Sequence, residues 1–304
     1  MKVALTGGTG VIGRSAVATL VAAGHDVVCL ARSKDSARLI RAAGATPFEG
    51  SLFDASDLVG LFEGADAGIN LATHIPVGLA AALPGAWRTN DLIRTKGVAL
   101  IASAARQAGV RRLIQESVSY LYADAGTEWI DEDSPVDITP VTEPVAVAES
   151  TVHDFTTTAR CGVVLRFGLI LGEDPMTRAN LKAVRSGRPV GIGQPDGYAH
   201  VVHTDDLGGA VAAALTAPSG VYNVGAAPVL RAELIEGYAT ALGVAPTGFV
   251  GPVVRRIAGA RLEPLSRSLR VRSDRFAQAT GWRPQRPDFE PGWLQLPERA
   301  KVAR

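Results

Sequence analysis

The feature that most constrains the fold of this chain is a glycine-rich segment near its start, Thr6-Gly7-Gly8-Thr9-Gly10-Val11-Ile12-Gly13. A short apolar run precedes it, and an amphipathic run with the spacing of a helix follows it. Gly7 permits a tight turn, Gly10 lets the backbone approach a pyrophosphate, and Gly13 lets a helix pack closely on a strand. Strand, turn, helix and second strand follow in this order within about 30 residues. The segment therefore predicts a dinucleotide-binding turn whose helix N-terminus faces the phosphates.

Short apolar runs continue to alternate with helical segments as far as about residue 172. Such alternation predicts βαβ units, and hence an α/β, Rossmann-like, doubly wound parallel sheet. Ala-Gly pairs at 23–24, 43–44 and 108–109 are expected to end three helices. We expect a cofactor domain over residues 1–172, with contributions from about 200–228. Residues 173–304 are expected to form a smaller substrate-binding lobe, with the site in the cleft between the two parts.

Composition excludes several classes of function. Hydrophobic residues make up 47% of the chain and charged residues 20%, as in soluble globular proteins. The arginines are scattered among acids, so no nucleic-acid partner is expected. No run approaches the ~18 apolar residues that span a bilayer, so no membrane partner is expected either. Cys29 and Cys161 lie in apolar runs, which favours reduced thiols in a cytoplasmic protein. The pattern leaves the oligomeric state open.

The end of the second predicted strand indicates which dinucleotide is bound. A site for NAD normally ends this strand with an acid that holds the ribose hydroxyls, whereas a 2′-phosphate requires cations. This strand ends Cys29-Leu30-Ala31-Arg32-Ser33-Lys34, with no acid before Asp35. Arg32 can bind a phosphate with two donors, and Arg14 can approach it from the first helix. The expected cofactor is NADP(H).

Over nearly its whole length the chain resembles the extended short-chain dehydrogenase/reductase family. The motifs are the glycine segment, residues 50–54 with Ser51 where Asp is usual, residues 70–73, and the C-terminal segments 201–211, 221–225 and 279–284. In that family His203 and Asp206 belong to a signature that starts a helix, so we expect structural roles for them. The resemblance and the glycine motif together imply cofactor contacts from Gly7, Gly10, Val11, Ile12, Gly13, Arg14, Arg32, Ser33, Ser51, Leu52, Leu71, Ala72, Thr73, Ser117, Phe167 and Leu169.

The chain departs from this family at the catalytic residues. Members typically use an Asn, Ser or Thr, Tyr and Lys tetrad, in which Tyr exchanges the proton and Lys lowers its pKa. The corresponding positions here are Arg94, Val118, Val141 and Val145. No lysine occurs between Lys96 and Lys182, so this region holds no Tyr-x-x-x-Lys motif.

A second departure concerns the substrate. Sugar-nucleotide enzymes of the family usually carry Asn where this chain has Leu169, so a diphosphate anchor is missing. The segments 75–79 and 83–87 are apolar and irregular, and the second contains Trp87. They suit a flat hydrophobic substrate better than a sugar.

Three side chains are candidates for contact with the reacting group. Ser119 and Tyr120 follow the fifth predicted strand, where dehydratases of the family place an acid and a base, and His74 lies just beyond Thr73. The acidic residues Glu128, Asp131, Glu132 and Asp133 predict a solvated loop. No histidine or cysteine spacing accompanies them, so no metal is expected.

These patterns favour an NADPH-dependent ketoreductase acting on a hydrophobic, aromatic polyketide-like ketone, similar to atypical ketoreductases of secondary metabolism and antibiotic biosynthesis. Loss of a general acid costs ~10²- to 10⁴-fold in rate. An activated ketone tolerates this loss when a neighbouring hydroxyl stabilises the oxyanion. A non-catalytic NADP(H)-binding sensor or regulator is the alternative interpretation. A nucleotide-sugar epimerase or dehydratase is disfavoured, because the proton-transfer pair and the phosphate anchor are both absent.

Overall fold

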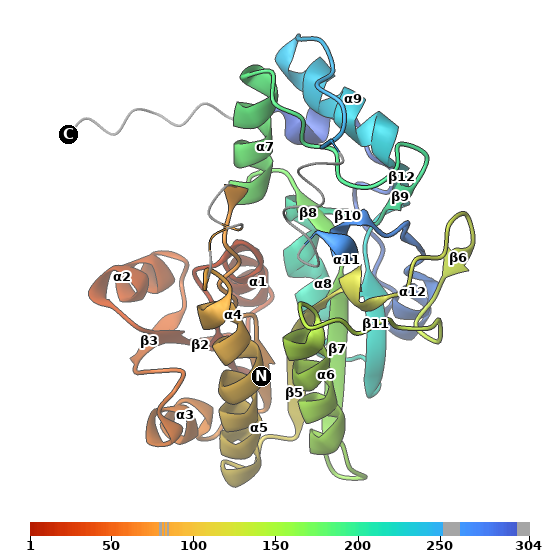
Figure 1. Ribbon diagram of the computed structural model, residues 1–304. Helices are drawn as coiled ribbons and strands as arrows, with labels where there is room; N and C mark the ends of the chain where they lie inside the picture. The colour runs from red at the N-terminus through yellow and green to blue at the C-terminus, as the bar shows by residue number, and fades with distance from the viewer. Residues whose placement is uncertain (79–80, 82, 84, 252–261, 297–304) are drawn as a thin grey trace, which may run out of the picture.

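The protein is described by a computed structural model that covers residues 1–78, 81, 83, 85–251 and 262–296 (Figure 1). Its centre is a parallel sheet of seven strands in the order β11-β7-β5-β4-β1-β2-β3. The strands are β1 (Lys2–Thr6), β2 (Asp26–Ala31), β3 (Thr46–Glu49), β4 (Ala67–Asn70), β5 (Arg112–Val118), β7 (Cys161–Phe167) and β11 (Gly220–Val224). This is the predicted doubly wound α/β fold, and its strand order reverses between β1 and β4.

Helices cover both faces of the sheet, because the strands are apolar on both sides. Four helices pack on one face: α1 (Val11–Ala22), α2 (Lys34–Ala42), α8 (Leu207–Ala213) and α12 (Asp274–Thr280). Three pack on the other: α3 (Ala55–Phe62), α5 (Val98–Gln107) and α6 (Glu143–Phe155). A short helix, α4 (Arg88–Leu92), continues through a π-helical turn at Ile93–Gly97 into α5.

Three helix ends agree with the sequence prediction. Gly24, Gly44 and Gly109 follow α1, α2 and α5 with φ of 78°, 82° and 77°. In this left-handed region a Cβ is unfavourable, so glycine terminates each helix at little cost.

The remaining described elements form a lobe above the sheet in Figure 1. Its helices are α7 (Pro175–Arg185), α9 (Arg231–Leu242) and the short α11 (Glu263–Ser266), with a 3-10 turn at Pro291–Leu294. Paired short strands connect them to the sheet: β8 (Leu169–Leu171) with β10 (Val201–His203), β9 (Tyr198–Ala199) with β12 (Val229–Leu230), and β6 (Trp129–Ile130) with β13 (Arg270–Val271). A separate apolar core, including Leu234, Tyr238 and Trp293, lies between α7, α9 and the turn.

The C-terminal part of the chain does not stay in the lobe. The sequence-based division assigned residues 173–304 to it, apart from about 200–228. In the structure Phe276 of α12 is fully buried in the main core, and its ring lies 5.5 Å from Tyr222 of β11 and 5.4 Å from Trp282. Residues 274–282 therefore pack with the sheet, and residues 252–261 and 297–304 of the predicted lobe lie outside the described residues.

Within the described part of the chain, no helix has the length and hydropathy needed to cross a membrane. The same residues contain no group of three His, Cys, Asp or Glu side chains arranged to hold a metal ion. Cys29 and Cys161 are both free thiols, and burial raises the pKa of Cys29 to about 12.

Candidate active site

The glycine segment forms a turn in which backbone meets backbone. Gly7 has φ of 80°, and a Cβ there would lie 2.4 Å from the carbonyl carbon of Leu71 in the loop after β4. A Cβ on Gly13 would lie 2.1 Å from the Gly7 oxygen. Strand β1, helix α1 and the β4 loop can approach this closely only because these residues are glycines.

The N-terminus of α1 fits a pyrophosphate. Gly10 precedes the helix and has no side chain to cap it. The N–H groups of Val11, Ile12 and Gly13 donate to no partner within the described residues, and the first intrahelical bond runs from the Arg14 N–H to the Gly10 oxygen at 3.0 Å. Such free donors at the positive end of a helix dipole complement anionic oxygens.

A buried polar network fixes the β4 loop beside this turn. The Thr6 hydroxyl donates to Asn70 Oδ1 at 2.5 Å, and Asn70 Nδ2 donates to Gln115 Oε1 at 2.8 Å. The Ala72 N–H also donates to Asn70 Oδ1, at 3.1 Å. The network ties β1, β4 and β5 together where the strand order reverses, so it holds Leu71, Ala72 and Thr73 in one place.

Two exposed arginines flank the expected position of the adenosine ribose. Arg32 directly follows β2 and Arg14 lies in the first turn of α1. Neither makes an ion pair with any residue that the structure describes. Ser33 caps α2, because its hydroxyl accepts from the Ser36 N–H at 3.2 Å, and Ser36 Oγ accepts from the Ser33 N–H in return.

The segment 50–54 is likewise held by local bonds. The Ser51 N–H donates to Asp57 at 2.8 Å, and the Ser51 hydroxyl accepts from the Phe53 N–H at 3.1 Å. Leu52 is half-buried and its side chain packs close to Gly97 of the π-helical turn. The loop that follows β3 is thus fixed near α5 without any ligand.

The candidate catalytic residues Ser119 and Tyr120 share one 3-10 turn, Ser119–Leu121, at the end of β5. The Ser119 hydroxyl is buried and finds no partner among the described residues. Tyr120 is half-buried, and burial raises its pKa to about 12, with the Arg231 charge opposing the shift. His74 is exposed in the β4 loop, where its backbone N–H donates to Asn90 Oδ1 at 3.1 Å. The described hydrogen bonds do not connect His74 with the 3-10 turn.

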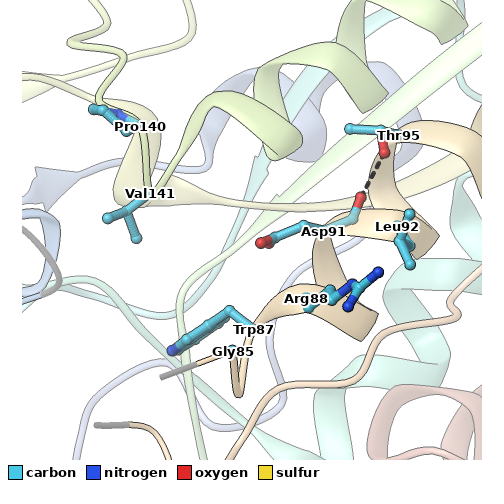
Figure 2. Close-up of a pocket in the computed structure, with 8 residues that line it drawn as sticks. All are labelled: Gly85, Trp87, Arg88, Asp91, Leu92, Thr95, Pro140 and Val141. Atoms are coloured by element: carbon cyan, nitrogen blue, oxygen red, sulfur yellow. Dashed lines mark hydrogen bonds between the residues drawn. The ribbon is translucent and has the colours of Figure 1, made fainter. Parts of the chain in front are cut away.

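A pocket of about 390 Å³ lies between α4 and the loop that precedes α6 (Figure 2). Trp87, Asp91 and Leu92 line one side, and Pro140 and Val141 line the other. The described residues of the lobe do not contribute to its lining, and the predicted cleft between sheet and lobe stays a prediction. Residues 79, 80, 82 and 84 of the two apolar segments lie outside the described residues.

Comparison with known proteins decides the family. The sequence model of the NAD dependent epimerase/dehydratase family matches residues 3–225. The chain belongs to this family. A 3-diazoavenalumate denitrifying reductase from a Streptomyces species is 28% identical over 96% of this chain and 99% of its own length. A 4-hydroxy-2-methyl-3-oxo-4-farnesyl-3,4-dihydroquinoline-1-oxide ketoreductase from Stigmatella aurantiaca is 33% identical over 45% of this chain and 39% of its own length.

The solved structure of human epimerase family protein SDR39U1 with NADPH has the same fold. It shares 24% identity and a TM-score of 0.78, over 97% of this chain and 98% of that one. Family membership and the reductase relatives identify the protein as an enzyme of the NAD(P)-dependent oxidoreductase type. The glycine turn and the free N–H groups of α1 fit the nicotinamide dinucleotide that this epimerase family uses.

Arg94, which is predicted to occupy the family's asparagine position, forms a buried ion pair that the sequence did not indicate. It lies in the π-helical turn, and its Nη2 is 3.0 Å from a carboxylate oxygen of Glu116 on β5. The two side chains are only 2% and 3% exposed. The one available signal was Glu116 itself, an acid in a strand that was predicted to lie inside the sheet.

The sequence predicts that Val141 and Val145 occupy the family's tyrosine and lysine positions. Val141 lines the pocket of Figure 2, and Val145 on the first turns of α6 is buried. Neither side chain can exchange a proton or hold a ribose hydroxyl. The part of the pocket wall that Pro140 and Val141 form is therefore apolar.

Ser117 was predicted to contact the cofactor, but its hydroxyl has a protein partner. It donates to Glu149 of α6 at 2.5 Å, and Arg166 of β7 binds both oxygens of that carboxylate at 2.9 and 2.6 Å. The Arg166 guanidinium lies 4.7 Å from the ring centre of Tyr122, whose hydroxyl donates to Asn223 on β11. The buried network joins α6 to three neighbouring strands, a structural role that sequence spacing could not reveal.

The strand end at β7 is closely packed. Phe167 is 1% exposed and belongs to the main core, while Leu169 is half-buried on β8. A Cβ on Gly168 would lie 2.8 Å from the His200 backbone, and one on Gly225 would lie 2.0 Å from His200 Nε2. Burial lowers the pKa of His200 to about 3, so this histidine is neutral.

The family signature residues have structural contacts. His203 packs edge-on against Trp293, with ring centres 5.1 Å apart, and Asp206 accepts from the Gln285 N–H at 2.6 Å. These contacts join the start of α8 to the C-terminal segment.

The sequence predicted a solvated acidic loop, but three of its four acidic residues form ion pairs in the structure. Asp131 pairs with Arg272 at 2.9 Å, and Arg275 pairs with Asp133 and, at 3.4 Å, with Glu132. The pairs connect the loop before Pro135 to α12 and to Arg272 just before it.

Proposed function

We propose that the protein is an NADPH-dependent reductase of a hydrophobic, aromatic polyketide-like ketone, working without the family's Tyr-Lys proton-transfer pair. The observation that carries the proposal is Val141 in the wall of the pocket. A site whose proton donor is replaced by an apolar side chain suits a substrate that is reduced with little help from a protein acid.

The bound dinucleotide would supply the hydride, which is the cofactor's own chemistry. The chain's part is to bind and orient it. The free N–H groups at the start of α1 would hold the pyrophosphate, and Arg32 with Arg14 would hold the 2′-phosphate. The absence of a described ion pair at Arg32 supports the choice of NADP(H), because the guanidinium is available to a phosphate.

The pocket supports an aromatic substrate. Trp87, Leu92, Pro140 and Val141 give it flat and apolar surfaces that an aromatic ring can contact. The missing amide at Leu169 argues against the diphosphate of a nucleotide sugar. These features favour a reductase of secondary metabolism, including antibiotic biosynthesis, over an epimerase.

The proton would come from water or from a hydroxyl beside the substrate carbonyl. Losing a general acid costs ~10²- to 10⁴-fold, which an activated ketone tolerates. Ser119 and Tyr120 could donate auxiliary hydrogen bonds. Because the pKa of Tyr120 is raised to about 12, its hydroxyl keeps its proton at neutral pH.

A second candidate function is the reductive loss of nitrogen from an aromatic diazo compound. The Streptomyces relative that matches nearly the full length of both chains carries that activity in its name. Hydride addition to the carbon that loses N₂ does not require a protein acid at a carbonyl oxygen, so the valines fit this chemistry as well. The sensor interpretation is disfavoured by family relatives named as reductases.

The test is a substrate panel followed by NADPH absorbance. We expect turnover of hydroxyaryl ketones and quinones, and none of UDP- or dTDP-sugars. Turnover of a nucleotide sugar would refute the proposal, and turnover of aryl diazo compounds alone would select the second candidate. Tight NADPH binding with no turnover of any compound would support a sensor instead.

A further inference from the structure

Two side chains at and just before α4 line the same pocket. Trp87 directly precedes α4 and Asp91 follows it by four residues, so both lie on one side of this segment, and Figure 2 shows the Asp91 carboxyl directed toward Val141. The Trp87 ring is oriented by a hydrogen bond from its Nε1 to the Ala81 oxygen at 3.0 Å. The indole thus offers a fixed flat surface inside the pocket.

Asp91 is the acidic side chain of the pocket lining, and its charge is not neutralised by a described neighbour. The ion pairs of the described residues do not include it. Arg94 on the same helical segment forms an ion pair with Glu116. Figure 2 shows Arg88 directed away from Asp91 and Trp87. Burial raises the pKa of Asp91, while the Asn90 side chain and the Arg94 charge lower it by less. A half-buried carboxylate of this kind gains from a hydrogen-bond donor.

We propose that Asp91 accepts a hydrogen bond from a phenolic hydroxyl of the substrate, whose aromatic ring stacks on Trp87. A neutral donor fits better than a cation, because the positive charge of Arg88 already belongs to the pocket lining. The volume of about 390 Å³ falls in the range of small-molecule sites. The inference rests on the proposed function and names its substrate class, a hydroxylated aromatic ketone. Asp91 is a specificity-determining residue in this account.

The test compares two ligands that differ by one hydroxyl, 6-hydroxy-1-tetralone and 1-tetralone. Their binding to the NADP⁺-loaded protein is measured by calorimetry, so no turnover is needed. We expect the wild type to bind the hydroxylated ligand about tenfold more tightly, as for a hydrogen bond to a charged acceptor. Asp91→Leu should bring the ratio of the two affinities to about one. Asp91→Asn should keep part of the preference, because its amide oxygen still accepts.

The matched control is Arg106→Leu, which removes an exposed charge from α5, outside the pocket lining. It should leave the ratio of affinities unchanged. Equal binding of both ligands by the wild type would overturn the proposal, as would a loss in Asp91→Leu that affects both ligands equally. Melting temperatures of the variants exclude unfolding as the cause. Failure of the proposed function would show differently, as absent NADPH oxidation in the substrate panel whatever the ratio of affinities.

Discussion

Replacing Gly13 by alanine tests the backbone contacts on which cofactor binding depends. The added Cβ would lie 2.1 Å from the Gly7 oxygen and 2.8 Å from the Gly8 Cα, whereas such atoms prefer about 3.5 Å or more. The start of α1 must therefore move by more than about 1 Å. Overpacking of this kind costs about 1–3 kcal/mol of stability. A misplacement of about 1 Å in a group that positions a ligand can lower a reaction rate roughly 10²-fold.

We expect Gly13→Ala to bind NADPH at least tenfold more weakly in a calorimetric titration, with a melting temperature lower by a few degrees. Gly292→Ala is the matched control, because a Cβ there meets nothing within 4 Å. That variant should bind NADPH as the wild type does. Unchanged NADPH affinity in a folded Gly13→Ala protein would refute the assignment of this turn to the pyrophosphate.

Three further predictions follow from single side chains. Arg32→Asp should weaken NADPH binding by about 2 kcal/mol, or about 30-fold, and spare NADH; equal affinity of the wild type for both cofactors would contradict it. Burial lowers the pKa of His200 to about 3, so only the unfolded chain gains a proton below pH 6.5 and stability falls as the pH drops. Urea titrations should show that this histidine lowers the free energy of unfolding by roughly 2 kcal/mol between pH 7 and pH 5. The His200→Asn variant should lack this loss, and an identical pH dependence in the variant would contradict the prediction. Glu149→Gln should lower the free energy of unfolding by about 3 kcal/mol, because Arg166 is left buried without its partner. Asp133→Asn, at an exposed pair, should change it by less than about 1 kcal/mol in the same urea titration, and a similar loss in both variants would contradict the argument.

Local chemistry explains why the fold was predictable from the sequence. The turn at Gly7 and the helix ends at Gly24, Gly44 and Gly109 each require a backbone conformation that glycine adopts readily. Alternation of apolar strands and amphipathic helices then fixes the doubly wound sheet. The return of Phe276 to the main core was not predictable in this way, because its partner Tyr222 lies more than fifty residues earlier in the chain.

The candidate site was only partly predictable, for the same reason. Valines at 141 and 145 could be read from the sequence, and Val141 indeed lines a pocket. The pairing of Arg94 with Glu116, and of Ser117 with Glu149, depends on how helices dock on the sheet. The sequence did not indicate Asp91 as a pocket residue, because a charged residue in a short helix is ordinarily exposed.

The central claim is that no single side chain of this enzyme supplies an indispensable proton. The direct measurement is the reduction rate of Ser119→Ala, Tyr120→Phe and His74→Ala with a hydroxyaryl ketone, from pH 6 to 9. Removing an auxiliary hydrogen-bond donor should cost about tenfold, so each variant should retain a measurable rate. Because burial raises the pKa of Tyr120 to about 12, this hydroxyl stays protonated across the range and should add no steep limb near neutrality. A variant that loses ~10²-fold or more while its NADPH affinity stays unchanged would reveal a dedicated acid and contradict the account.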